Sequence, residues 1–389
     1  MVAALVTLVT AISSAYVVFR DDPVPVEAAV AAPTTTTAST EPPTSTTTTA
    51  PPLRSATVAF GGDILIHSGL WGAADTGGGY DFSPMLAPIA PRLTGADLAI
   101  CHLEVTLARL DDTLSSYPRF RAPGALATDL AEAGFDGCSV ASNHALDFGE
   151  EGVVATLDGL DAAGLAHAGT ARSPEGRVPA IYDAGGMRVA HLSYAYGFNG
   201  FVRPAGKEWL VDQIDPNLIL ADAHAARAAG AELVVVSLHW GDEYVHEVVA
   251  AQQAVADVLA ADVGAVDLVV GHHAHVVQPI SKAGSMWVVW GMGNLLSNNS
   301  PRCCTTEATD GVLVTVTIGD TAPGGPVGVT GIAFTPTWNE RTAYRVLPAE
   351  DTLAAGTDPG LAADLQASLD RTTGHILSLG GTELGVARS

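Results

Sequence analysis

The sequence predicts an α/β fold in which strands and helices alternate along the chain. From Leu53 onward, short apolar runs rich in Val, Ile and Leu are separated by Ala-rich amphipathic stretches. Apolar runs of this length are typical of strands, and the stretches between them are typical of helices. A β-rich piece follows at about 311–339 and indicates an antiparallel edge or a second sheet.

The candidate elements follow one another in a regular order. The candidate strands lie near residues 56–63, 97–104, 137–144, 187–194, 232–240, 267–275 and 286–294. The candidate helices lie near residues 124–133, 150–163, 216–229 and 247–262. Asp215 and Pro216 suit the N-cap and the first turn of the third helix.

Acidic side chains dominate the composition, with 42 Asp and Glu against 18 Lys and Arg and a formal net charge of -24. A chain with this charge repels the phosphates of nucleic acids, so we expect no nucleic-acid partner. The cysteines at 101, 138, 303 and 304 are an even number that is compatible with disulfides in an oxidising compartment. The sequence leaves their pairing open.

Two N-terminal segments differ from the rest of the chain. Residues 1–20 contain an uncharged apolar run, Val2 to Phe19, close to the roughly 20 residues that span a bilayer as a helix. The run predicts a signal anchor or a signal peptide, and an uncleaved anchor is favoured because the nearest small-x-small cleavage site, Ala29 to Ala31, lies well past its end. Residues 21–52 are rich in Thr and Pro and predict a disordered stalk.

These segments predict the domain organisation and the location of the protein. We expect an anchor at 1–20, a stalk at 21–52, a globular domain at 53–350 and a C-terminal helical tail at 351–389. The anchor would attach the protein to the membrane by a single span, and the stalk would hold the globular domain away from the membrane surface. The expected location is therefore the cell membrane, with the globular domain outside the cytoplasm.

Residues that can bind metal stand at the ends of the predicted strands. They are Asp63, Glu104, Asn143, His239 and a histidine cluster that includes His273 and His275. In α/β sheets the carboxyl ends of the strands converge, so these side chains are expected to meet. Mixed nitrogen and oxygen ligands suit Mn, Fe or Zn. Each residue alone could be a strand-end polar group bonded to a loop, but their joint placement favours a metal site.

The segments that carry these residues resemble a known family. The segments are "FGGDILIH", "HLEVTL", "ASNHALDFGEEGV", "SLHWGDEY", "GAVDLVVGHHAHVVQPI" and "WGMGNLL". In this order, from about Thr57 to about Leu296, they look like motifs of the CapA family, the poly-γ-glutamate capsule biosynthesis proteins, which fall within the calcineurin-like metallophosphoesterase superfamily. The resemblance implies a two-sheet β-sandwich flanked by helices, with a metal site at the strand ends.

The resemblance also implies roles for single residues around two divalent ions. Asp63 and His275 would bind the first ion, and Glu104 would join the two ions. The residues implied for the second ion are Asn143, His239 and His273.

His144 matches a family histidine that is no ligand but donates a proton near the leaving group. Asp147 would hold its other ring nitrogen. The two residues also fit a helix-capping turn before the predicted helix at 150–163, and both interpretations can hold together.

Four residues are candidates for substrate binding. Arg119 and Arg121 lie in "YPRFRAPG", which resembles a family segment near the site, although two arginines can equally be surface residues. Glu243 lies in "HWGDEY" and Asn294 in "WGMGNLL", both of which resemble near-site sequence.

Two positions depart from the pattern. Superfamily enzymes usually carry Asp-x-His in the first motif, but here the third position is Leu65, and His67 is a possible substitute. His102 stands where the family more often has Asn. It is either a partner of a metal ligand or a polar residue on the opposite face of the strand.

The sequence therefore predicts an extracytoplasmic, membrane-anchored metal-dependent hydrolase of the phosphoesterase type. Its expected substrate is an anionic envelope polymer or a phosphoester, in the biosynthesis of a poly-γ-glutamate capsule or another envelope polymer. Two alternatives stay open. One is a metal-dependent hydrolase or transferase acting on a γ-glutamyl amide. The other is a polymer-binding assembly factor with a structural metal site, which works beside membrane-bound polymer synthase partners.

Overall fold

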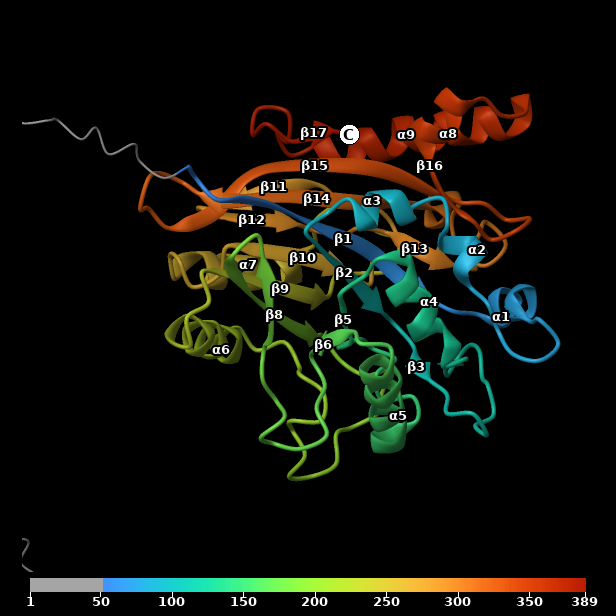
Figure 1. The fold of residues 1–389 in the computed structure, drawn as a ribbon, viewed down its shortest axis with the longest axis horizontal. Helices are drawn as coiled ribbons and strands as arrows, with labels where there is room; N and C mark the ends of the chain where they lie inside the picture. The colour runs from blue at the N-terminus through green and yellow to red at the C-terminus, as the bar shows by residue number, and fades with distance from the viewer. Residues whose placement is uncertain (1–51) are drawn as a thin grey trace, which may run out of the picture. The chain divides into compact units, whose positions relative to one another are not determined.

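The computed structural model describes residues 52–389 (Figure 1). The predicted anchor, and all of the predicted stalk except its last residue, lie outside the described residues. Residues 52–389 belong to one compact unit. None of the helices in this range combines the length and the hydrophobicity of a membrane span.

The larger of two main sheets has nine strands. Its main path runs β16-β15-β14-β1-β2-β5-β6, while β13 pairs with β1 and β17 pairs with β15. The strands are β1 (Ser55–Leu65), β2 (Leu98–Leu103), β5 (Gly137–Ser139), β6 (Ala166–Ala168), β13 (Asn294–Ser297), β14 (Asp310–Asp320), β15 (Val327–Asn339), β16 (Val346–Pro348) and β17 (Ala387–Arg388). Strands β1, β2, β5 and β6 are parallel, so their carboxyl ends share one edge.

The smaller main sheet has six strands in the order β11-β12-β10-β9-β8-β7. They are β7 (Ala180–Ala184), β8 (Met187–Ala195), β9 (Leu233–His239), β10 (Leu268–His272), β11 (Ile280–Ala283) and β12 (Met286–Val289). Strands β8, β9 and β10 are parallel. A separate two-stranded ladder joins β3 (Thr106–Leu107) to β4 (Arg121–Ala122).

Helices cover the outer faces of both sheets. An apolar cluster joins the larger sheet to α1 (Ser68–Ala74), α2 (Ser83–Leu86), α3 (Ala90–Thr94), α4 (Ala125–Ala133) and α5 (Gly149–Ala162). Another joins the smaller sheet to α6 (Pro216–Ala228) and α7 (Ala250–Ala261). Helices α8 (Ala349–Ala355) and α9 (Pro359–Leu377) pack on β15 and β16, and a short 3-10 helix, η1 (Thr306–Thr309), precedes β14.

Strand β9 shows why the predicted strands are continuously apolar. Leu233 and Val235 belong to the cluster between the two sheets, whereas Val234 and Val236 belong to the cluster beneath α6 and α7. Successive residues of a strand point to opposite faces, and here both faces are covered. The predicted α/β arrangement of two sheets flanked by helices is confirmed.

Every strand and helix predicted between residues 56 and 294 corresponds to an element of the structure, but several strands end earlier than predicted. Strand β5 ends at Ser139, β10 at His272 and β12 at Val289. The residues that follow form loops that carry site residues. The N-cap of α6 is as predicted, since Asp215 Oδ1 accepts the Asn217 N–H at 2.9 Å.

The segment after residue 350 contributes to the larger sheet as well as to helices. Helix α9 packs on β15, and β17 pairs with the same strand in parallel. The predicted domain boundary at this point stays a prediction.

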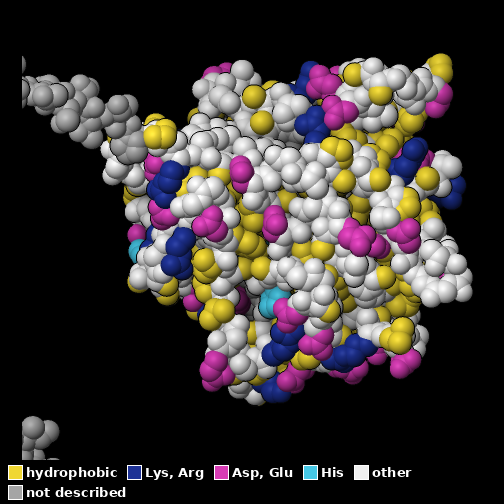
Figure 2. All heavy atoms as spheres, viewed as in Figure 1, with side chains coloured by type: hydrophobic (Ala, Val, Ile, Leu, Met, Phe, Trp, Pro, Cys, Tyr) yellow, Lys and Arg dark blue, Asp and Glu magenta, His cyan; other side chains and the backbone are white. Residues whose placement is uncertain are grey.

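On the face drawn in Figure 2, Asp and Glu side chains are widely spread, whereas Lys and Arg gather in a few groups.

A close backbone contact holds the end of β1 against the start of β13. The Asp63 N–H donates to the Gly293 carbonyl at 2.9 Å, and the register of the two strands shifts between Asp63 and Ile64. A Cβ atom on Gly62 would lie 2.2 Å from the Gly293 oxygen. Only glycine fits here, and the contact sets the position of the Asp63 carboxylate.

We expect Gly62→Ala to lower the free energy of unfolding by about 1–3 kcal/mol, because the added methyl group forces the two strands apart. Urea-induced unfolding of the chain measures the change. Gly72→Ala is the matched control, since a Cβ atom at Gly72 meets no atom within 4 Å. Equal midpoints and slopes for Gly62→Ala and the wild type would contradict the close contact.

Candidate metal centre and active site

The ends of parallel strands from both main sheets bring a buried group of acids and imidazoles together. Asp63 lies near the end of β1, and Glu104 directly follows β2. His239 and His272 are the last residues of β9 and β10. The potential ligand atoms fall into three overlapping groups, each within 4.8 Å: Asp63, His102 and His272; His102, Glu104 and His239; and Glu104, His273 and His275.

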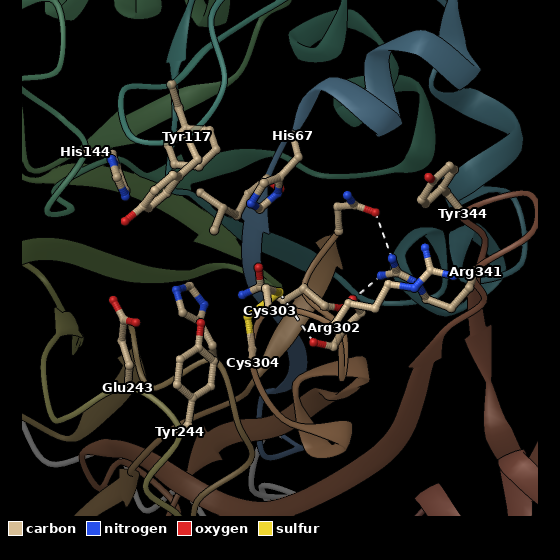
Figure 3. Close-up of a pocket in the computed structure, with 16 residues that line it drawn as sticks. His67, Tyr117, His144, Glu243, Tyr244, Arg302, Cys303, Cys304, Arg341 and Tyr344 are labelled. Atoms are coloured by element: carbon tan, nitrogen blue, oxygen red, sulfur yellow. Dashed lines mark hydrogen bonds between the residues drawn. A yellow bond between two sulfur atoms is a disulfide. The ribbon is translucent and has the colours of Figure 1, made fainter.

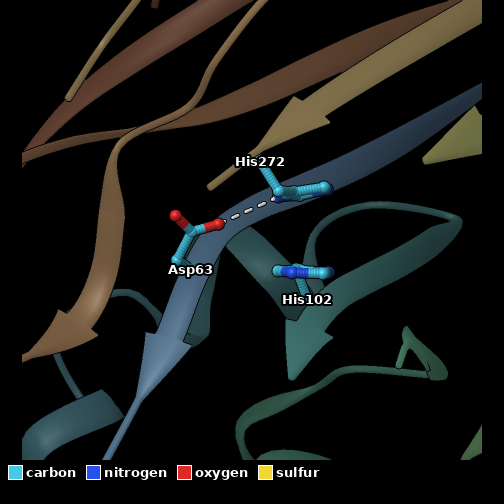
Figure 4. A group of neighbouring side chains, drawn as sticks. All are labelled: Asp63, His102 and His272. Carbon is cyan, nitrogen blue, oxygen red and sulfur yellow. Dashed lines mark ion pairs between the residues drawn. The ribbon is translucent and has the colours of Figure 1, made fainter. Parts of the chain in front are cut away.

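The first group joins β1, β2 and β10 (Figure 4). His272 Nδ1 lies 3.3 Å from Asp63 Oδ1. The ring of His102 stacks on that of His272 with centroids 3.9 Å apart and an angle of 15° between the planes. The other Asp63 oxygen lies 3.2 Å from His275 Nδ1 and accepts the backbone N–H of His273 at 3.1 Å.

Glu104 lies between imidazoles from the smaller sheet. Its Oε1 atom is 3.6 Å from His239 Nε2 and 3.6 Å from His275 Nε2. The His273 ring lies near both imidazoles, with its centroid 4.7 Å from that of His239 and 6.0 Å from that of His275. All six predicted metal ligands, including Asn143, are therefore buried and close together, and their assignment to a first and a second ion stays a prediction.

A chain of hydrogen bonds can leave one nitrogen of His239 free for a metal ion. Ser139 Oγ lies 3.3 Å from the Cys101 carbonyl oxygen and 2.8 Å from His102 Nδ1, and in the metal-binding tautomer it donates to the carbonyl and accepts the Nδ1–H of His102. Because a neutral imidazole carries one proton, His102 Nε2 then accepts from His239 Nδ1 at 2.9 Å. His239 therefore presents an unprotonated Nε2, the form in which imidazole binds metal.

This Nε2 atom faces oxygens instead of donors. It lies 3.0 Å from Asn143 Oδ1 and 3.6 Å from Glu104 Oε1. A nitrogen lone pair that faces two oxygen atoms is stabilised by a cation among them. The arrangement fits a metal ion.

Several buried polar atoms of this group have no hydrogen-bond partner among residues 52–389. They are Asp63 Oδ1, both carboxylate oxygens of Glu104, His272 Nδ1 and His273 Nδ1. An unpaired buried polar group costs several kcal/mol, and a carboxylate costs more. Metal coordination would satisfy these atoms, so the residues present fit a divalent ion with nitrogen and oxygen ligands.

Burial keeps most of the imidazoles neutral. It lowers the pKa of His273 to about 3, with a further contribution from the charge on His275. Burial also lowers the pKa of His102 and of His239 well below the usual value. Neutral imidazoles have the free lone pair that a metal requires.

The carboxylates and His275 behave differently. Burial raises the pKa of Glu104 well above its usual value. Burial acts in the same direction on Asp63, but the neighbouring imidazoles of His272 and His275 lower its pKa below the usual range. Although burial lowers the pKa of His275, the charges of Glu104 and Asp63 raise it to about 10. The charge on each of these three residues therefore depends on the charges of the other two.

Strained backbone surrounds the site. Among residues 52–389, the non-glycine residues with positive φ are Asn199 (49°), Tyr244 (64°), His273 (87°), His275 (55°) and Tyr344 (54°). His273 and His275 belong to the three ligand groups above, which we call the metal-binding group. Tyr244 and Tyr344 line the cavity described next, and Asn199 lies beside His144. Such conformations cost on the order of 1–3 kcal/mol each, and they collect at functional sites, where surrounding contacts hold them.

A cavity of about 730 Å³ adjoins the metal-binding group (Figure 3). His275 and His144 both contribute to its wall. His67 also lines it, with Nδ1 3.1 Å from the Leu65 carbonyl oxygen. His67 belongs to none of the three ligand groups, so the structure does not bring it beside Asp63 as a substitute imidazole.

The His144–Asp147 pair forms in the structure. His144 Nδ1 lies 2.8 Å from Asp147 Oδ2, and that carboxylate is fully buried. The same oxygen accepts the Phe120 N–H at 2.6 Å, and Arg119 Nε donates to the Asp147 carbonyl at 2.7 Å. Because Nδ1 is engaged, the Nε2 atom of His144 is left to exchange a proton with a ligand in the cavity.

The two predicted substrate arginines lie outside the residues that line the cavity. Arg119 binds the Asp147 carbonyl, and its guanidinium lies 4.6 Å from the centre of the Phe148 ring. The Arg121 guanidinium lies 3.7 Å from the same ring centre and forms an ion pair of 3.6 Å with Asp112. These contacts brace the segment that carries Asp147, and a role in substrate binding stays a prediction.

The other two substrate candidates lie in different surroundings. Glu243 is exposed and lines the cavity. Asn294 is fully buried behind His275: its Oδ1 lies 3.0 Å from His275 Nδ1, and its Nδ2 donates to the His275 carbonyl at 3.2 Å. Asn294 thus orients an imidazole, and its predicted contact with substrate stays untested.

Two histidines of the group were not predicted as metal ligands, although one of them, His102, was offered as a possible partner of a ligand. His272 shares a histidine cluster with the predicted ligands, and His102 precedes Leu103 and Glu104, but neither was a predicted ligand. Strand alternation would place His272 and His273 on opposite faces. The turn at His273, with φ of 87°, instead brings both toward the site.

We expect Glu104→Gln to lose bound metal while keeping its fold, because the amide retains the shape of the side chain but removes its charge. Elemental analysis of the purified chain measures the metal, and thermal unfolding monitors the fold. The control is Glu175→Gln, at an exposed carboxylate. A full metal content in Glu104→Gln would contradict the assignment.

We expect His102→Ala to weaken metal binding by about 10–100-fold, since it removes the hydrogen bond that orients His239. Competition against a fluorescent chelator gives the dissociation constants. His167→Ala is the control, because His167 lies outside the ligand groups and bonds Asp161. An unchanged affinity would show that His102 does not support His239.

Comparison with known proteins gives the chain's relationships. A family model described as bacterial capsule synthesis protein PGA_cap matches residues 57–299. Capsule biosynthesis protein CapA of Bacillus anthracis is 29% identical over 171 residues, which cover 43% of this chain and 41% of that protein. PGA biosynthesis protein CapA of Bacillus subtilis strain 168 is 29% identical over 178 residues, covering 43% and 44%. The matches thus span less than half of each relative.

Solved structures with similarity to this chain are more distant in sequence. The calcineurin-like phosphoesterase YfkN from Bacillus subtilis has 12% identity and a TM-score of 0.46, covering 82% of this chain and 98% of that one. A putative 5'-nucleotidase from Staphylococcus aureus has 14% identity and a TM-score of 0.45, covering 81% and 58%.

The resemblance predicted from the strand-end motifs is confirmed by the family match, which begins at Thr57 and includes every predicted metal ligand. The match covers more than half of the 389 residues. The chain therefore belongs to the PGA_cap family of bacterial capsule synthesis proteins.

Proposed function

We propose that this chain is a metal-dependent hydrolase of the phosphoesterase type that acts in forming or modifying a capsule or another envelope polymer. The observation that carries the proposal is the meeting of two features at one cavity. His275 of the metal-binding group and His144 of the His144–Asp147 pair line the same wall. A metal site beside a hydrogen-bonded imidazole is a combination suited to hydrolysis of a phosphoester.

The residues divide the chemistry between them. Asp63, Glu104 and His275 would hold one divalent ion, and Asn143, His239 and His273 would hold a second ion together with Glu104. A divalent ion such as Mn, Fe or Zn supplies Lewis-acid activation of water and neutralises phosphoryl charge. The orienting contacts of Asn294 and His102 keep the imidazoles in place.

His144 would donate the proton that the leaving oxygen takes up. Its Nδ1–H donates to Asp147, whose carboxylate stabilises the imidazolium form. When the bond between phosphorus and the leaving oxygen breaks, the Nε2–H donates its proton to that oxygen. Asp147 is held in turn by Phe120 and Arg119, so the imidazole keeps one orientation.

The setting of the reaction is also part of the proposal. The names of the curated relatives refer to capsule and PGA biosynthesis, which supports an anionic polymer as the substrate and polymer synthases as partners. The four cysteines form two disulfides, Cys101–Cys138 and Cys303–Cys304, a pattern typical of oxidising compartments. This supports an extracytoplasmic domain held at the membrane by residues 1–20.

We expect His144→Ala to lower kcat for diphenyl phosphate by about 10²–10⁴-fold, because its phenolate leaving oxygen, unlike the more stable p-nitrophenolate, depends on a proton donor. The metal content should not change, since His144 is no ligand. Steady-state kinetics with Mn²⁺, before and after chelation, measure the effect.

The matched control is His224→Ala. His224 forms a comparable pair with Asp262, with Nε2 2.8 Å from the carboxylate, but the pair lies on the surface. A wild-type rate in His144→Ala would contradict its role. Bound metal without hydrolysis of this diester would overturn the proposed activity, and γ-glutamyl p-nitroanilide then tests the amide alternative.

A further inference from the structure

The cavity continues past the metal-binding group to a basic end. Arg302 and Arg341 line it there, with Asn298 and Tyr344 beside them. Figure 3 shows Arg341 and Tyr344 across the cavity from His144 and Glu243. His275 of the metal-binding group and the two arginines thus line the same cavity.

Neither arginine has a carboxylate partner among residues 52–389. The adjacent carboxylate, Glu340, is engaged elsewhere: it lies 3.7 Å from Arg345 Nε and accepts the backbone N–H groups of Thr342 and Ala343 at 2.5 and 2.8 Å. In a chain with 42 acidic and 18 basic side chains, two unpaired guanidinium groups in one cavity are unexpected.

The hydrogen bonds at this end of the cavity hold Arg341 in position without neutralising its charge. Arg341 Nη1 donates to the Asn299 carbonyl and Nη2 donates to Asn298 Oδ1, both at 2.8 Å, and these acceptors are uncharged. Burial lowers the pKa of Arg341, and the nearby charge of Arg302 acts in the same direction. An anion between the two guanidinium groups would relieve this repulsion and use their remaining N–H donors.

A disulfide and backbone hydrogen bonds restrain the loop that carries Arg302. Cys303 and Cys304, which line the cavity, form a disulfide with each other. Their backbone N–H groups donate to the Ser300 carbonyl at 3.1 and 2.9 Å. Because Arg341 binds the same loop at Asn298 and Asn299, the two guanidinium groups share one framework.

We propose that Arg302 and Arg341 form an anion subsite that binds a second carboxylate or phosphate of the molecule whose reacting group lies at the metal-binding group. The inference rests on the proposed function and extends it. The enzyme selects substrates with at least two anionic groups, as a linear polyanion has. A guanidinium pair binds either oxyanion through paired N–H donors, so the source of the anion is decided by experiment.

Isothermal titration calorimetry of the metal-loaded chain tests the subsite with three probes. Tetra-γ-glutamate carries repeated carboxylates, 1,6-hexanediol bisphosphate carries two phosphates, and dimethyl phosphate carries one charge. We expect Arg341→Gln and Arg302→Gln each to weaken binding of at least one of the first two probes about tenfold more than that of dimethyl phosphate. Whichever polyanion loses more affinity identifies the preferred oxyanion.

Arg188→Gln is the matched control, because it removes an equal charge from an exposed arginine outside the cavity. It should bind all probes as the wild type does. Arg302 is exposed, so its variant tests the subsite even if Arg341→Gln fails to fold.

Three results would overturn the subsite. They are no binding of either polyanion by the wild type, equal losses for all three probes, and losses in Arg188→Gln that match those in the cavity variants. Hydrolysis of bis(p-nitrophenyl) phosphate, measured separately, reports on the proposed function. A failed subsite and a failed activity are therefore distinguishable.

Discussion

The structure depends on the burial of two carboxylates among imidazoles where the two main sheets meet. Asp63 and Glu104 are almost completely buried, and three of their four carboxylate oxygens have no hydrogen-bond partner among residues 52–389. Such a group needs compensating positive charge, from the His275 imidazolium or from a bound metal ion. The close contact at Gly62 and the left-handed turn at His273 hold ligands that would otherwise separate. The fold thus maintains an arrangement that is unfavourable without a cation.

The cavity beside this group is asymmetric. His144 and Glu243 lie at one end, and unpaired guanidinium groups lie at the other. An overall acidic protein would repel an anionic substrate at long range. Local positive charge, from Arg302 and Arg341 and from a metal ion when one is bound, would offset that repulsion within the cavity. Binding of a polyanion should therefore depend on contacts inside the cavity and gain little from long-range steering.

The sequence was most informative where both faces of a strand are covered. Continuous apolar runs such as β9 mark the strands, and the polar residues at their ends mark the site, because parallel strands bring their carboxyl ends together. The short helices α1, α2 and α3 lack the length for a clear helical period and were not predicted. The contact of Arg119 with Asp147, and that of Arg341 with the loop at 298–304, arise from tertiary packing between distant segments. No local pattern records such contacts, so the basic end of the cavity was not predicted.

The two disulfides affect the molecule in different ways. Cys101 and Cys138 face each other on neighbouring strands and close a loop across 37 positions, which restricts the unfolded chain and contributes about 4 kcal/mol in the chain-entropy account. Cys303 and Cys304 are adjacent, so their bond restricts almost none of the unfolded chain. Its effect is confined to the shape of the cavity rim. Material produced under reducing conditions would therefore lose global stability through one bond and local geometry through the other, and a correctly folded preparation can still carry an altered rim.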